Sequence, residues 1–146
     1  MHKLFLICAM FLTSIVQAQI YIDNPQVVVM VDNIKQQFKD QGISDRRFDN
    51  IDSIRVVSLD YPDVGYWRRT GDRHVIHIHP SAIGDRNIYK LEYILKHEIG
   101  HVFLGKEHTT DLLDIMCQFH EPPMSQEAWE LMNLKYFAAI RRVSVE

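Results

Sequence analysis

A segment in the second half of the chain, from Asn87 to Gly105, has the apolar periodicity of a helix that packs along one side. Its apolar positions form one stripe at helical spacing: Ile88, Leu91, Leu95, Ile99 and Val102. Asn87 is a suitable N-cap residue, and Gly105 is a suitable residue to end the helix. His97 and His101 lie off this stripe, four residues apart, and therefore stand one above the other on the helix surface. The segment predicts a helix that buries its apolar stripe and carries two imidazoles on another face.

The two histidines belong to the sequence His97-Glu98-Ile99-Gly100-His101, which has the HExxH pattern of zinc hydrolases. Imidazoles one turn apart can bind a single zinc ion at about 2.0 to 2.1 Å from each ring nitrogen. Glu98 would lie beside the ion, where its carboxylate can take a proton from a zinc-bound water. Because zinc lowers the pKa of that water to roughly 7, we expect amide or peptide hydrolysis with Glu98 as general base and acid.

Residues 94 to 117 resemble the metzincin metallopeptidases, whose signature is HExxHxxGxxH followed by a Met-turn. Beyond the HExxH pattern, Gly105, His108 and Met116 carry this resemblance. It implies that Gly105 ends the helix, that His108 is the third zinc ligand and that Met116 lies beneath the metal. It also implies a small α+β zincin-like catalytic domain with a few-stranded sheet, a backing helix, an active-site helix and a C-terminal helix. Such a domain would hold one catalytic Zn²⁺ and cleave a peptide or protein substrate.

The third histidine comes one residue later than the family pattern requires. His108 follows His101 by seven residues instead of six, and Gly105 is also one place late. One inserted residue at the helix end accounts for both shifts. Glycine suits that end because it adopts the left-handed conformation more readily than the leucine that the strict register would place there. Glu107 and Asp111 remain alternative third ligands.

Two other interpretations of the HExxH pattern stay open. In gluzincins, the third ligand is a Glu on a later helix, and Glu127 or Glu130 could serve in that role. The other alternative is a non-catalytic secreted module that holds zinc. The shifted third ligand favours this module, as does Gln118, which stands where some metzincins carry a Tyr two residues after the Met. Glu98 argues against it, because a purely structural zinc site needs no base.

Two further helices are predicted at the ends of the chain. Asn24 and Pro25 form an N-cap and first-turn pair, and the helix that follows is expected to end near Gly42. Its apolar positions are Val27, Val31, Ile34 and Phe38. Ser125 can cap a last helix, whose apolar stripe is Trp129, Met132, Tyr136 and Ile140. These stripes are typical of core packing.

Strands are predicted over residues 54–59 and 74–79, with a loop over 61–72 between them. Metzincins place an antiparallel edge strand just before the active-site helix to hold an extended substrate, and residues 74–79 occupy a comparable place. Edge-strand pairing would supply main-chain hydrogen bonds to a peptide. The histidines at 74, 77 and 79 also suggest a second metal site, although solvated strand histidines are the simpler explanation.

Residues 1–18 have the features of a secretory signal peptide. His2 and Lys3 precede an apolar run from Leu4 to Val16, and compact residues follow at the expected cleavage position. The run is shorter than the roughly 20 apolar residues needed to span a bilayer. We therefore expect an exported protein, periplasmic or extracellular, with residues 19–146 as a single catalytic domain that has no membrane contact after cleavage.

Composition restricts the partners and the sources of stability. The formal net charge is −3 at pH 7, and the sequence contains no basic run, so neither nucleic acid nor an anionic membrane is an expected partner. After removal of the leader, Cys117 is the one cysteine left, so no internal disulfide can form. We expect Cys117 to be a small buried residue.

Overall fold

The computed structural model describes residues 19–59, 64–84, 89–105, 108–117 and 125–144 of the 146-residue chain. Its elements in chain order are β1 (Tyr21–Ile22), α1 (Pro25–Asp40), the 3-10 helix η1 (Arg46–Asn50), β2 (Ile51–Val56), β3 (Gly65–Thr70), β4 (Arg73–Ile78), the 3-10 helix η2 (Pro80–Ala82), α2 (Lys90–Leu104) and α3 (Gln126–Ser144). The described part is thus a mixed α/β fold with one four-stranded sheet and three α-helices, compatible with the α+β expectation.

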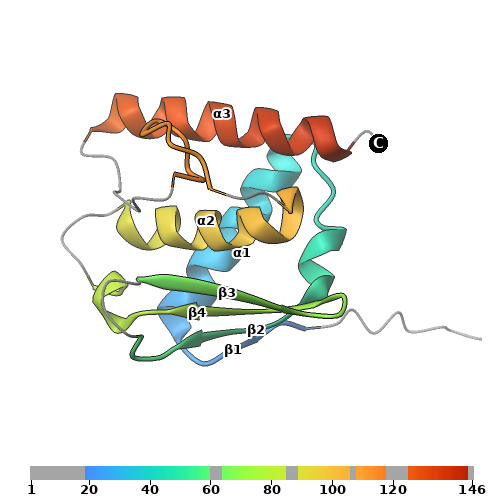
Figure 1. Ribbon diagram of the computed structural model, residues 1–146, viewed down its shortest axis with the longest axis vertical. Coiled ribbons are helices and arrows are strands. Elements are labelled where there is room, and N and C mark those ends of the chain that lie inside the picture. Colours follow the sequence, from blue (N-terminus) through green and yellow to red (C-terminus); the bar gives the residue numbers. More distant parts are fainter. Residues whose placement is uncertain (1–18, 60–63, 85–88, 106–107, 118–124, 145–146) are drawn as a thin grey trace, which may run out of the picture.

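Helix α2 lies at the centre of the molecule. Figure 1 shows it between the sheet and α3, with α1 crossing behind it. Because neighbours cover it from several directions, every residue from Tyr93 to Phe103 is buried. His97 and His101 lie off the apolar stripe, as predicted, and they are buried as well. A single apolar stripe shows which face of a helix packs most tightly, but not what covers the other faces.

The sheet has the strand order β1-β2-β4-β3. Strands β1, β2 and β4 are mutually parallel, and β3 pairs with β4 in the antiparallel direction. Strand β4 matches the predicted strand 74–79 closely, and β2 begins at Ile51, earlier than the predicted 54–59. However, β4 is an interior strand, because it pairs with β2 on one side and β3 on the other. The expectation that it would form the edge is wrong.

The predicted loop over 61–72 is also wrong for residues 65–70, because Gly65–Thr70 forms β3, an edge strand of the sheet. A tight turn with Gly71 at φ 62° joins it to β4. An edge strand can keep polar side chains in water, and Arg68 and Arg69 are indeed exposed. This polarity, together with the surrounding Gly and Pro residues, gives the strand the composition of a loop.

The two terminal helices agree with their predictions. The side chain of Asn24 accepts hydrogen bonds from the backbone of Gln26 and Val27 at the start of α1, and Gly42 follows its end with φ 66°. Ser125 Oγ accepts from the Ala128 amide at the start of α3. The residues of both predicted stripes are buried: Val27, Val31, Ile34, Phe38, Trp129, Met132, Tyr136 and Ile140.

A buried cation holds the three helices together. The Lys96 side chain is fully buried, and its Nζ lies 2.9 Å from Glu92 Oε1 and 2.6 Å from Gln37 Oε1. The same amine bonds Asn133 Oδ1 and lies 4.9 Å from the ring centre of Trp129. Burial lowers the pKa of Lys96, while the charge of Glu92 opposes this shift.

Some of the predicted features fall on residues that the structure does not describe. The proposed leader, residues 1–18, lies outside the described residues, as does the predicted N-cap Asn87. Helix α2 starts at Lys90 in the structure. Among the described helices, none has the length and hydropathy to cross a bilayer. Cys117 is buried, as expected.

Candidate metal centre

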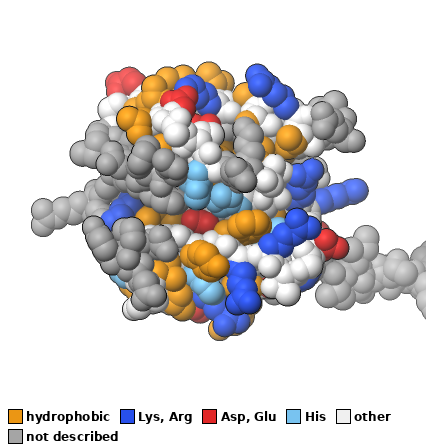
Figure 2. Space-filling view, viewed as in Figure 1, with side chains coloured by type: hydrophobic (Ala, Val, Ile, Leu, Met, Phe, Trp, Pro, Cys, Tyr) orange, Lys and Arg blue, Asp and Glu red, His pale blue; other side chains and the backbone are white. Residues whose placement is uncertain are grey.

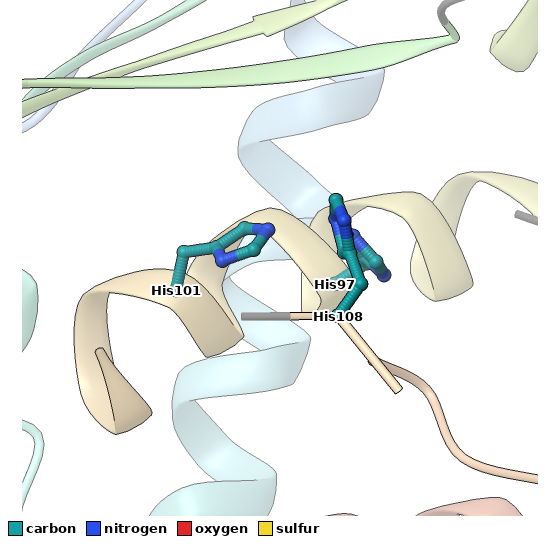
Figure 3. A group of neighbouring side chains, drawn as sticks. All are labelled: His97, His101 and His108. Carbon is teal, nitrogen blue, oxygen red and sulfur yellow. The ribbon is translucent and has the colours of Figure 1, made fainter. Parts of the chain in front are cut away.

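Three histidines converge at one point beside α2. His97 and His101 project from the same side of the helix, and His108 reaches them from the segment that follows Gly105 (Figure 3). One ring nitrogen from each side chain lies within 4.8 Å of the others. His97 and His101 are buried and His108 is exposed, so the group opens to solvent on one side. In the part of the chain that the structure describes, this is the one cluster of ligand-type side chains that could hold a metal ion.

The orientation of His97 leaves one nitrogen for a metal. Its Nδ1 lies 2.6 Å from the Ile115 carbonyl oxygen, and since a carbonyl only accepts, Nδ1 must carry the proton. Its Nε2 then keeps a lone pair, and His108 Nε2 lies 3.0 Å from it. Two nitrogens bound tetrahedrally to one zinc ion stand about 3.3 Å apart, given Zn–N bonds of about 2.0 to 2.1 Å. The rings are therefore close to the spacing that a shared ion requires.

Gly105 is the residue that allows His108 to return. It has φ 57° and ψ 20°, and its amide donates to the His101 carbonyl, which closes the last turn of α2. The chain then reverses, as the sequence predicted for a glycine at this position. The structure thus brings His108 to His97 and His101 despite the extra residue between them.

The segment after His108 folds back and is held by hydrogen bonds between its own residues. The Thr109 amide donates to the Met116 carbonyl, and the Met116 amide donates to Asp114 Oδ1. Met116 is buried against the backbone of α2, because a Cβ added to Gly100 would overlap its Sδ. Met116 therefore lies directly against the helical turn between the two HExxH histidines.

The side chain of Glu98 points from α2 toward strand β3. Its side chain is 2% exposed, and a Cβ added to Gly65 on β3 would lie 2.5 Å from its Oε1. Gly65 therefore leaves the space that the carboxylate occupies. In the middle of Figure 2, histidine side chains (pale blue) lie in a furrow of the surface, and an acidic side chain (red) lies beside them.

Of the alternative third ligands, those among the described residues do not join the cluster. Asp111 is exposed and binds Lys135 Nζ at 2.8 Å, and this hydrogen bond lowers the pKa of the Asp111 carboxyl. Glu127 and Glu130 are exposed residues of α3, and neither belongs to the metal-binding group. Glu107 lies outside the described residues, as does Gln118.

The histidines at 74, 77 and 79 make other contacts and do not form a second metal-binding group. His74 accepts a hydrogen bond from Trp67, His77 stacks on Tyr66 and His79 accepts from the Ser81 amide. Trp67 also stacks on His101, whereas the sequence predicts a loop at this position. The sequence signal for this contact was an isolated tryptophan shortly before a predicted strand. Periodicity alone does not show that its side chain reaches the histidine cluster.

Comparison of the chain with family models, with curated proteins and with solved structures found no match. The chemistry of the site therefore carries its functional interpretation. Three imidazoles form a donor set that suits zinc and other borderline metals, and three protein ligands leave a coordination position open. A group of this kind could hold a metal ion, with a buried carboxylate as its neighbour.

Proposed function

We propose that this protein is a zinc-dependent metallopeptidase of the metzincin type, exported to the periplasm or the extracellular space. The observation that carries the proposal is the convergence of His97, His101 and His108 beside the buried Glu98. Three histidines are the ligand set of catalytic zinc in several enzymes, whereas structural sites are closed by a fourth protein ligand. The leader-like residues 1–18 support export.

Each residue of the site has a distinct role in this proposal. His97, His101 and His108 hold the ion, and the Ile115 carbonyl fixes the tautomer of His97. When bound, zinc supplies Lewis-acid catalysis and makes water nucleophilic near neutral pH. Glu98 takes the proton from the attacking water at its carboxylate and delivers it to the leaving amine. Met116 packs against Gly100 of α2 and so supports the helical turn between His97 and His101.

The edge strand supplies a place for the substrate. Strand β3 pairs with β4 on one side, so its other side can pair with an extended peptide. Gly65 brings this strand against Glu98, so a peptide beside β3 would lie close to the carboxylate. Main-chain pairing tolerates many sequences, which suits a peptide or protein substrate.

The test compares zinc content and peptide hydrolysis in the chain from residue 19 onward. Wild type is expected to bind one zinc ion and to cleave members of a mixed peptide library. Glu98→Gln should keep the zinc and lose activity by about 10²- to 10⁴-fold, because it removes the proton acceptor. His108→Ala should lose the zinc. Glu130→Gln is the matched control and should change neither property.

Three results would contradict the proposal. A zinc-loaded wild type without hydrolysis of any library peptide favours the non-catalytic module. Normal zinc binding by His108→Ala removes this residue from the ligand set, and loss of zinc in Glu130→Gln would favour the gluzincin arrangement.

A further inference from the structure

Trp67 of the edge strand packs flat on one of the HExxH histidines. The ring centres of Trp67 and His101 are 5.1 Å apart, with 17° between the planes. The other two histidines approach His101 edge-on, at 79° for His97 and 73° for His108. The indole therefore covers a face of the His101 ring, while the metal-binding side of the cluster lies toward the other histidines.

A hydrogen bond fixes Trp67 in turn. Its Nε1–H donates to Nδ1 of His74, over a distance of 2.8 Å. His74 lies on β4 and is 7% exposed, and the two rings are inclined by 21°. Burial, followed by the charge of Arg69, lowers the pKa of His74, which favours the neutral ring that can accept this bond. The indole consequently cannot rotate or slide without losing this partly buried hydrogen bond.

We propose that Trp67 is a positioning residue that holds the ring plane of His101 for metal binding, with His74 as its anchor. The proposal rests on the metal site of the proposed function, but not on hydrolysis. Ring rotation of a ligand must be restricted before or during binding, and a flat aromatic contact restricts it beforehand. An imidazole that donates to a metal ion also becomes electron-poor, which favours its contact with an indole face.

The measurement is metal affinity, obtained by competition with a chelator, together with the visible spectrum of the Co²⁺-loaded protein. Trp67→Leu should weaken Zn²⁺ and Co²⁺ binding by about 10- to 100-fold, the usual effect of removing a residue that orients a ligand. Trp67→Phe keeps a ring and should lose less. Tyr66→Leu is the matched control, because Tyr66 lies on the same strand but stacks on His77 on the other face of the sheet.

The role of His74 is tested by a double-mutant comparison. His74→Leu should weaken binding in the wild type and have little further effect in Trp67→Leu, because it acts through the indole. Trp67→Phe and His74→Leu also keep the proposal testable if Trp67→Leu does not fold. Wild-type affinity and Co²⁺ spectrum in any folded Trp67 or His74 variant would overturn it.

Failure of this proposal is distinguishable from failure of the proposed function. If neither the wild type nor the variants hydrolyse peptides, but Trp67→Leu binds metal more weakly than the wild type, only the peptidase assignment is lost. If wild type is active and Trp67→Leu binds metal normally, only the positioning role is lost.

Discussion

Gly100 shows how tightly the helix of the candidate metal site is packed. A Cβ at this position would overlap Met116 Sδ and lie 3.3 Å from Tyr136 Cε2. Glycine within a helix costs about 1 kcal/mol relative to alanine, so its presence here reflects the close approach of Met116. The x positions of the HExxH pattern are therefore not all interchangeable in this chain.

Gly100→Ala is expected to destabilise the protein by about 1 to 3 kcal/mol, because overpacking outweighs the gain in helix propensity. It should also weaken metal binding, since it displaces the segment that carries His108. Urea unfolding and chelator competition measure the two effects. In a Met116→Ala background the same substitution should cost much less, and an equal cost in both backgrounds would show that Met116 is not the obstacle.

Residue types and their spacing predicted much of the candidate site, whereas contacts between distant segments could not be predicted from the sequence. The shift of His108 could be inferred because Gly105 moved with it, and Gly105 has the expected left-handed conformation. The hydrogen bond between His97 and the Ile115 carbonyl could not be inferred, because it joins residues that are adjacent only after the chain reverses. The same holds for Gly65 and Gly100, whose close neighbours come from other elements.

At the level of elements, helices were easier to predict than strands. Helices α1 and α3 have capping residues and stripes that their own sequences display. Strand β3 has neither clear alternation nor apolar character, and its pairing with β4 alone makes it a strand. Whether β4 lies at the edge or inside depends on β3, so missing one strand also misplaced the other.

The position of β3 against α2 leads to a prediction for Gly65. A Cβ there would lie 2.5 Å from Glu98 Oε1 and 2.8 Å from Ile94 Cγ2. Gly65→Ala should displace the carboxylate by a fraction of an ångström or more and lower peptide hydrolysis, by up to about 100-fold for a 1 Å shift. Zinc content should remain at the wild-type level.

Thr70→Ala, at the far end of the same strand, is the control and should leave hydrolysis unchanged. Full activity in Gly65→Ala would mean that Glu98 can move without consequence, which would argue against its role as general base.

For the whole molecule, one core joins the helices and the sheet. Phe38 of α1 lies at the centre of an aromatic cluster, with ring centres 4.7 Å from Phe103 and 5.4 Å from Phe137. Cys117 is the one cysteine in the described residues, and it is unpaired. Among the described residues no disulfide can join α2 to the segment carrying His108, whereas a metal ion held by the three histidines could link them.

Zinc should stabilise the folded protein through that cross-link. A ligand that binds only the folded state at 100 times its Kd adds about 2.7 kcal/mol to the free energy of unfolding. Thermal unfolding is expected to shift upward by several degrees with zinc and to return to the metal-free value after chelation. The variant with His97, His101 and His108 all changed to Ala should show no shift. An equal shift in that variant would place the bound zinc elsewhere.

Lys96 gives the helical layer an internal chemical reporter. Its amine is enclosed by Gln37 of α1 and by Asn133 and Trp129 of α3. An acylating reagent can reach this nitrogen only when α1 or α3 moves away from α2. The labelling rate of a single lysine therefore measures how often the packing of α1 and α3 against α2 opens, and it does so whether or not the protein has a substrate.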